Sequence, residues 1–269
     1  MNSIKVNDTD IYTSRNIEFM NACFINNVHK VKEILDGGGV DINFRNFEKY
    51  TMFIIACRYK QMEIIKLLLK YKELDINAKN ILGHTAFTSA CCYGYDEVVK
   101  LLLENVNLDI NITTNEGYTG YIFSCFYGYS EIIKLLINDK RLNINIKTKK
   151  GNDGFTTACI HSRIEIVKLL INNNKVTNII DAYVKSCFNR NREVIKLLLL
   201  INHDLVNYDT SEHENKNLRI IDDDIIEFIV NYVKSKEYSD EKKRINNKIG
   251  SDIFSLSVLL SDEYYFIKN

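Results

Sequence analysis

The chain of 269 residues contains no proline and no tryptophan, and it carries no net charge. Its 35 Lys and Arg residues balance 35 Asp and Glu residues, which argues against a nucleic-acid partner because phosphate binders normally carry a basic excess. The longest apolar runs, such as residues 52–57, are too short for a transmembrane helix, so we expect no membrane association. The first ten residues lack the apolar core of a secretion signal. We therefore expect a cytoplasmic protein, or one in the host cytoplasm if it is viral.

Hydrophobic residues make up 46% of the chain and charged residues 26%, which is typical of a folded protein rather than a disordered one. Within this composition the cysteines are periodic, because six of the seven directly follow a small residue. The spacings between them are 34, 34, 34, 34 and 28 residues. The pairs are Ala22-Cys23, Ala56-Cys57, Ala90-Cys91, Ser124-Cys125, Ala158-Cys159 and Ser186-Cys187.

Two further markers repeat with the same period of 34 residues. An Ile-Asn pair recurs at Asn43, Asn77, Asn111 and Asn145, and a Glu-x-x-Lys pattern recurs inside apolar runs, beginning at Glu63, Glu97, Glu131, Glu165 and Glu193. Three markers that shift together indicate a tandem repeat, with one shortened unit before the sixth.

Each unit has the pattern of two helices joined by a turn. In the third unit Thr85 is suited to cap the first helix, as are its equivalents Thr51, Thr119 and Asp153 in other units. Gly94 is suited to end the helix, because glycine tolerates the left-handed conformation. A second helix is predicted from about Asp96 to Leu103. Glu97 and Lys100 would lie one turn apart on its outer side, where they can form an ion pair. One such unit cannot bury both helices alone, so stability is expected to come from stacking on neighbours.

The segment Gly83 to Leu103, followed by Asp109-Ile-Asn111, resembles the ankyrin-repeat family, and the resemblance covers about residues 17 to 207. It implies a mainly α fold: an ankyrin-repeat solenoid of about six helix-turn-helix units with short hairpin loops, plus a helical C-terminal cap. The predicted array spans 1–207 and the cap 208–269, and the final segment 253–268 is similar to tails of giant-virus and amoeba-type ankyrin proteins. The repeats are expected near 17–43, 46–77, 80–111, 114–145, 148–173 and 181–207.

The sequence departs from the family pattern at positions that normally form a hydrogen-bond network. The family's proline is replaced throughout, and the histidine that follows it is Ile, Thr, Ile and Thr in successive units. The family's second histidine is Tyr95 in the third unit and Tyr129 in the fourth. We therefore expect this network to be missing or different, and the stability not to be unusually high.

The sequence contains few residues whose spacing suits a catalytic, metal or cofactor site. Without a C-x-x-C motif a zinc site is not expected, and the periodic thiols are interpreted as small core residues. Residues 36–39 (Asp-Gly-Gly-Gly) follow a helix and lack the Lys-Ser/Thr of a phosphate loop. The five histidines form no ligand or triad spacing. We expect no enzyme activity, no metal and no cofactor, with a protein as the partner and the chain as a monomer.

The resemblance implies that a partner binds the concave side, formed by the loop tips and the outer ends of the first helices. Exposed helix ends are normally polar, but here they carry Tyr, Phe and Ile in successive units, and such aromatic residues are enriched at interfaces. The alternative is that these rings pack on neighbouring repeats. The predicted helix-end residues are Arg58, Tyr59, Cys92, Tyr93, Phe126, Tyr127, Ile160 and His161, and the loop-tip residues are Tyr50, Ile81, Leu82, His84 and Tyr118.

The sequence predicts a non-enzymatic protein-interaction scaffold. One alternative is an adaptor whose C-terminal segment engages a ubiquitin ligase or another host complex, although the Leu-Pro pair of the F-box type is absent. An enzyme hidden in the last 62 residues is the other alternative. The resemblance further implies that asparaginyl hydroxylases could modify Asn43, Asn77, Asn111, Asn145 and Asn207.

The shortened step lies between Cys159 and Cys187, where six residues are missing relative to the other units. Because the helices on both sides keep their motifs, the missing residues must come from the connection at 172–180. The sequence therefore predicts a tight turn there in place of the hairpin found at the other junctions.

Overall fold

The structure is a computed structural model that describes residues 14–202, 205, 223–235 and 238–243. The regular secondary structure of these residues is helical, which confirms the predicted mainly α repeat fold, and a single bridge pairs Arg45 with Thr51. The chain divides into two compact units between Gly151 and Asn152. The predicted boundary at 207/208 and the apolar segment 253–268 lie outside the described residues.

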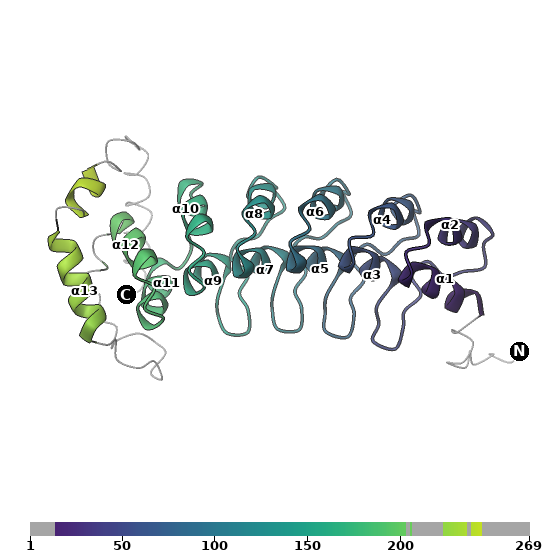
Figure 1. The fold of residues 1–269 in the computed structure, drawn as a ribbon, viewed down its shortest axis with the longest axis horizontal. Helices are drawn as coiled ribbons and strands as arrows, with labels where there is room; N and C mark the ends of the chain where they lie inside the picture. Colours follow the sequence, from purple (N-terminus) through teal and green to yellow (C-terminus); the bar gives the residue numbers. More distant parts are fainter. Residues whose placement is uncertain (1–13, 203–204, 206–222, 236–237, 244–269) are drawn as a thin grey trace, which may run out of the picture. The chain divides into compact units, whose positions relative to one another are not determined.

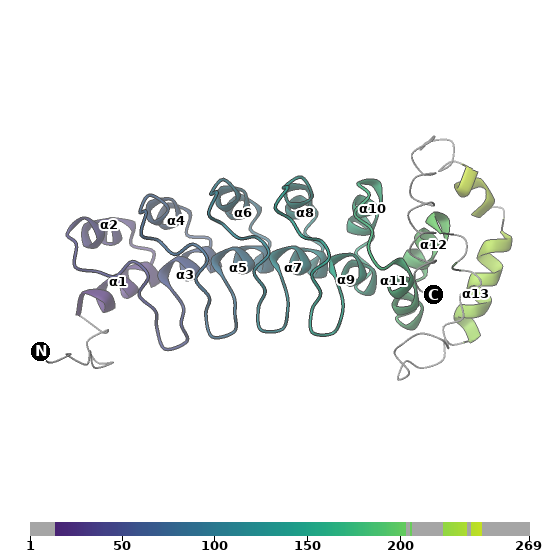
Figure 2. The same cartoon turned by 180° about the vertical axis from the view of Figure 1, so that it is seen from behind.

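The first unit contains four pairs of helices arranged in two rows (Figures 1 and 2). Helices α1, α3, α5 and α7 form the first row, and α2, α4, α6 and α8 form the second. Between pairs the chain extends as a hairpin loop on the side of the first row away from the second. The bounds are Ser14–Phe24 (α1), Val28–Asp36 (α2), Met52–Arg58 (α3), Met62–Leu68 (α4), Ala86–Tyr93 (α5), Asp96–Leu103 (α6), Gly120–Tyr127 (α7) and Ser130–Ile137 (α8).

The first-row helices begin at side-chain caps. The side chains of Thr51, Thr85 and Thr119 each accept a hydrogen bond from a backbone N–H three residues later, at 3.1–3.2 Å. This satisfies one of the free donors at the start of each helix, as the sequence predicted. Gly94 and Gly128 end α5 and α7 in the left-handed conformation. Asn26 and Lys60 adopt the same conformation in the first two units without being glycine.

The core lies between successive first helices and between the two rows. All four small-residue–Cys pairs of the first unit are buried, and so are the apolar positions of the second helices, such as Val98, Val99 and Leu102. The position of the family's proline is occupied by buried Met52, Ala86 and Gly120. At Gly120 an added Cβ would lie 2.6 Å from the Phe87 ring and 2.8 Å from Cys91 Sγ, so α5 and α7 can approach this closely only without a side chain there.

Different side chains take the place of the family's second histidine. Gln61 is buried and its amide donates to the carbonyl of Cys23 in the preceding repeat at 2.8 Å. Tyr129 instead packs its ring over Gly94, where a Cβ would meet the ring carbons at 2.7 Å. One position therefore links repeats by a hydrogen bond in the second unit and by ring packing in the fourth.

Asparagine side chains form a ladder between the loops that end each repeat. Asn43 donates to Glu73 O at 2.7 Å and accepts from Asp75 N at 2.7 Å, one repeat further along. Asn77 makes the same two contacts with Asn107 O and Asp109 N, at 2.8 and 3.0 Å. Asn111 continues with Arg141 O and Asn143 N, at 2.7 and 2.9 Å. Each amide thus bridges two repeats with both its donor and its acceptor.

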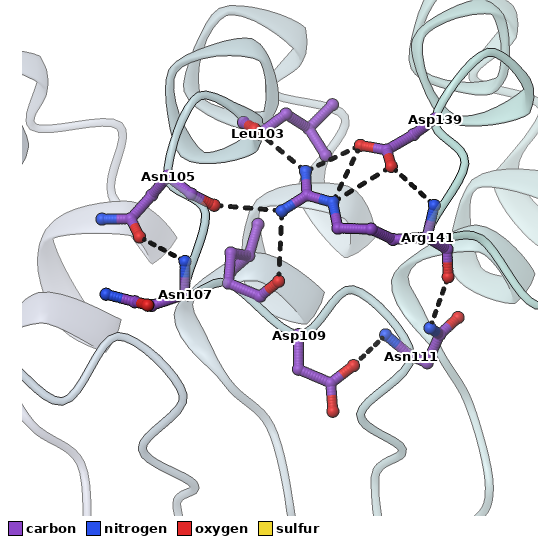
Figure 3. A network of polar contacts seen from close by, with 8 residues as sticks. Leu103, Asn105, Asn107, Asp109, Asn111, Asp139 and Arg141 are labelled. Carbon is purple, nitrogen blue, oxygen red and sulfur yellow. Dashed lines mark hydrogen bonds and ion pairs between the residues drawn. The ribbon is translucent and has the colours of Figure 1, made fainter.

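Arg141 adds a second link at the junction of the third and fourth repeats (Figure 3). Its guanidinium donates to the carbonyl oxygens of Leu103 (2.9 Å), Asn105 (3.0 Å) and Leu108 (3.3 Å). Its charge is paired with Asp139 at 2.7 Å, and this contact lowers the pKa of the Asp139 carboxyl. The side chain therefore satisfies one carbonyl group at the C-terminal end of α6 and two carbonyl groups of the loop that follows it.

The hairpin loops are also joined side by side along their tips. The backbone N–H groups of Ile81, Asn115 and Lys149 each donate to a carbonyl of the preceding hairpin, at 2.9–3.0 Å. This regular lateral bonding holds the hairpins of the first unit at a constant spacing.

The second unit contains α9 (Gly154–Ile160), α10 (Ile164–Asn172), α11 (Ile179–Phe188), α12 (Arg192–Ile201) and α13 (Asp223–Lys234), followed by a helical stretch at 238–243. Only residues 173–178 join α10 to α11, whereas residues 104–119 join α6 to α7. The predicted tight turn in place of a hairpin is therefore confirmed. Helix α11 is also longer than α9, so part of the shortened connection has become helix.

Helix α13 contacts α12 through one face. Ile225, Ile229 and Tyr232 are buried, and their spacing of four and three residues places them on one face of the helix. Lys196 of α12 lies 5.2 Å from the centre of the Tyr232 ring. Asp224, in the first turn of α13, lies near Arg190 and Arg192, at 3.6 and 3.8 Å.

The Glu-x-x-Lys residues form ion pairs in four of the five predicted units. The longest of these pairs has 3.9 Å between Lys168 Nζ and Glu165 Oε1. The prediction that Glu97 pairs with Lys100 was wrong. Glu97 binds Lys60 of the preceding repeat at 2.9 Å, because the left-handed turn at Lys60 brings its ammonium group to the start of α6.

Replacing Asn77 by alanine removes both inter-repeat contacts of its amide, so we expect the free energy of unfolding to fall by about 1–2 kcal/mol. Asn145 is the matched control, since it has the same repeat position but is exposed. Thermal unfolding followed by circular dichroism should show a lower midpoint for Asn77→Ala and almost none of this change for Asn145→Ala. Equal effects of the two substitutions would contradict the ladder.

Replacing Arg141 by alanine leaves three carbonyl groups without their donor and Asp139 without its cation. We expect a loss of about 2 kcal/mol, because hydrogen bonds to charged groups are the stronger ones but this guanidinium is partly exposed. Urea titration would measure the loss, with Lys140→Ala, an exposed neighbour, as the control. A change below about 0.5 kcal/mol would show that water replaces the guanidinium without cost.

Candidate protein-binding surface

Three tyrosines occupy the same register at the ends of the first-row helices. Tyr59 follows α3, Tyr93 ends α5 and Tyr127 ends α7, one repeat apart. Their exposed fractions are 59%, 43% and 42%. The rings therefore keep much of their area in solvent and are not buried between repeats.

A second group of aromatic side chains lies between the hairpins and the helix ends. The Tyr118 ring stacks on Phe123 at 4.9 Å between centroids, and His84 stacks on the same ring at 5.5 Å. Phe126 meets Tyr118 edge-on at 6.3 Å and Tyr127 at 4.8 Å. These contacts hold two predicted loop residues and two predicted helix-end residues in one cluster. Phe123 was not among the residues predicted from the sequence. The equivalent residue of the preceding unit is Ser89, so the repeat pattern does not indicate an aromatic side chain there.

Arg58 connects the second and third repeats on this face. Its guanidinium donates to the hydroxyl of Tyr50 at 2.7 Å and lies 5.7 Å from the centre of the Tyr50 ring. It also lies 5.6 Å from the centre of the Tyr93 ring. The structure therefore brings Tyr50, Arg58 and Tyr93 together around one positive charge. Cation–π contacts of this kind hold the guanidinium in place at a partly exposed site.

The hairpin tips of the second and third repeats are apolar. Ile81 and Leu82 are 56% and 57% exposed, and Phe47, which the sequence reading missed, is 87% exposed. Phe47 stands at the equivalent tip of the preceding hairpin, so the repeat alignment could have revealed it. Single exposed apolar residues are common, but exposed apolar residues at two neighbouring tips are a feature of interaction surfaces.

Ile160 and His161 belong to the second unit and are half-buried at the end of α9. Burial and the charge of Arg163 lower the pKa of His161. His84 in the first unit also has a lowered pKa, through burial and the charge of Arg58. Both imidazoles are therefore favoured in the neutral form at pH 7.

The asparagines predicted to be hydroxylated occupy the ladder described above. Asn43, Asn77 and Asn111 use both ends of their amides within it, whereas Asn145 is exposed and Asn207 lies outside the described residues. Modification at these positions stays a prediction. The three bridging amides would have to leave their partners to enter an enzyme's site.

The thiols differ in accessibility. The six periodic cysteines are buried and unpaired in disulfides, and Cys92 is partly exposed. Burial raises the pKa of Cys23 and of Cys187 to about 12 and also raises the pKa of Cys57 and Cys91. Burial raises the pKa of Cys92 as well, while its contact with the Tyr127 hydroxyl and the charge of Arg58 act in the opposite direction.

Among the described residues, no three His, Cys, Asp or Glu side chains are grouped closely enough to hold a metal ion. Within the same part of the chain no helix is both long and apolar enough to cross a membrane.

A family model described as ankyrin repeats (3 copies) matches residues 19–115 and 121–210 of the chain. A search among curated proteins finds no match.

A small neutral alkylating reagent should label one thiol of the folded protein and all seven in denaturant, because Cys92 is partly exposed and the other six cysteines are buried. Mass spectrometry of the intact protein would count the labels. Cys92→Ser should remove the fast label, whereas Cys91→Ser should leave it. Rapid labelling of more than one buried cysteine would show that the repeats open readily.

Proposed function

Because the chain belongs to the ankyrin-repeat family, whose members are generally protein–protein interaction modules, we propose that it binds a protein partner on the aromatic face of its first unit. We define this aromatic face by the helix-end residues Arg58, Tyr59, Cys92, Tyr93, Phe126 and Tyr127 and the hairpin residues Phe47, Tyr50, Ile81, Leu82, His84 and Tyr118. The family is typically non-catalytic, and we infer that this protein acts as a scaffold.

The observation that supports this face is the exposure of Tyr59, Tyr93 and Tyr127 in one register. Tyrosine offers a large contact area and a hydroxyl with few rotatable bonds, so it loses little conformational entropy when a partner covers it. Tyr118, which belongs to this face, stacks on Phe123, and this contact restricts the motion of both rings. A surface that is ordered before binding loses less entropy in the complex.

The second unit offers a natural comparison. Phe188 of α11 has the same place after its Ser-Cys pair as Phe126 has in α7, but the hairpin that precedes α7 has no equivalent before α11. We infer that binding depends mainly on the second to fourth repeats, where hairpins flank the helix ends of the first unit. The adaptor alternative depends on residues 208–269, of which only 223–235 and 238–243 are described, and no feature of these residues favours it.

Alanine at Tyr93 or Tyr127 should weaken binding of a captured partner about 5- to 30-fold, which corresponds to about 1–2 kcal/mol of lost contact energy. The partner would be captured with the full-length protein, purified and titrated against each variant. Phe188→Ala is the control and should change the affinity less than twofold. A loss centred on Phe188, with Tyr93 and Tyr127 neutral, would move the binding surface to the second unit.

A further inference from the structure

The aromatic face carries an excess of positive charge although the whole chain has none. We count the hairpin segments 45–50, 79–84, 113–118 and 147–150 together with the helix ends 58–60, 92–93 and 126–127. These segments contain eight basic residues: Arg45, Lys49, Arg58, Lys60, Lys79, Lys147, Lys149 and Lys150. They contain two acidic residues, Glu48 and Glu116. Positive charge is therefore concentrated where the exposed tyrosines lie.

Three of these eight cations are neutralised within the protein. Arg45 pairs with Asp75, Lys60 with Glu97 and Lys149 with Glu116, at 3.4, 2.9 and 3.4 Å. The other five, namely Lys49, Arg58, Lys79, Lys147 and Lys150, have no carboxylate within 4.0 Å in the described part of the chain. The surplus positive charge on this face is thus available to a partner.

Arg58 is the most constrained of the five. It is partly buried, and its neighbours include the hydroxyl and ring of Tyr50 and the ring of Tyr93. One of its five N–H groups is used by Tyr50, and the rest of the guanidinium fork has no hydrogen bond within the described residues. A guanidinium held between rings is suited to bind a carboxylate through two parallel hydrogen bonds.

The positive charge of Arg58 acts on titratable side chains of the neighbouring repeat. Burial and this charge lower the pKa of His84 on the hairpin of the third unit, and the charge opposes the rise that burial causes in the pKa of Cys92 at the helix end. The positive potential therefore extends across the stretch between Tyr59 and Tyr93. Complementary potentials of this kind select partners and speed their association.

We propose that the occupant of the aromatic face is an extended acidic segment of the partner protein, with an Asp or Glu carboxylate on Arg58 and apolar side chains against Tyr59, Tyr93 and Tyr127. This inference deepens the function proposed above and depends on it. Packed helices lie about 8–10 Å apart, and an extended chain in the polyproline II conformation rises about 3.1 Å per residue with three residues per turn, so every third side chain lies on the same side. Successive tyrosines therefore match side chains about three residues apart along such a segment.

The test is selection of peptides from a displayed library of random 12-residue sequences on the full-length protein. Selected peptides should be enriched in Asp and Glu over the starting library, with apolar residues about three positions apart. The best peptide, labelled with fluorescein, should bind in a polarisation assay at least about tenfold more weakly to Arg58→Gln, because hydrogen bonds to a charged group are strong. Binding should also weaken as salt is raised, since part of the attraction is electrostatic.

Two matched variants distinguish a specific loss of peptide binding from a loss of folding. Lys100→Gln removes an exposed cation from α6, on the other row of helices, and should leave binding within about twofold. Arg58→Lys keeps the charge but loses the planar fork, so its affinity should fall between those of the wild type and Arg58→Gln. The circular dichroism and thermal midpoint of each variant would be compared with the wild type. If Arg58→Gln is not folded, the same comparison is made with the double substitution Lys49→Gln and Lys79→Gln.

The outcomes separate this inference from the proposed function. Selected peptides that are neutral or basic, but lose affinity in Tyr93→Ala, would overturn the acidic partner and keep the aromatic face as the binding surface. Peptides that bind Tyr93→Ala and Tyr127→Ala as well as the wild type, or a library that yields no binder, would overturn both. Tighter binding of fluorescein-labelled 12-nucleotide oligouridine, weakened by Arg58→Gln, would replace the acidic protein segment with RNA.

Discussion

The close approach of successive first-row helices is the constraint on which the rest of the first unit depends. Each helix contributes a small residue followed by cysteine to the interface, and Gly120 shows how little space is left, since a single added carbon would overlap Phe87 and Cys91. This spacing brings the hairpins near enough to bond tip to tip and the loop asparagines near enough to bridge repeats. Stability in such a stack comes from neighbouring contacts, so these regular links matter more than any long-range contact.

Polar links compensate for the residues in which this chain departs from its family. Gln61 and Asn191 donate to carbonyl groups of the preceding first helix, and Asp153 and three threonines cap the helices that lack the family's proline. The network is therefore different rather than missing. Arg141 belongs to one repeat only and satisfies three carbonyl groups with one side chain, which a regular repeat pattern does not require.

The same regularity that builds the core also orders the surface. A residue at the end of each first helix recurs at a constant spacing, so three tyrosines form a row without any dedicated loop. The hairpins add apolar tips and most of the cations, while Asp75 and Glu97, at the loops and second helices, neutralise some of them. Arg58 stays without a carboxylate among the described residues, and its charge acts on the next repeat.

The sequence alone determined the repeat, its two-helix unit, the caps at Thr51, Thr85 and Thr119, and the missing hairpin before α11. These features follow from local periodicity, because the residues that specify them lie within one repeat of each other. The tertiary structure decided which side chains meet across repeats. Glu97 pairs with Lys60 rather than Lys100, and Arg58 lies between Tyr50 and Tyr93. Such contacts depend on backbone turns, as at left-handed Lys60, and on the stacking distance, neither of which a sequence pattern specifies.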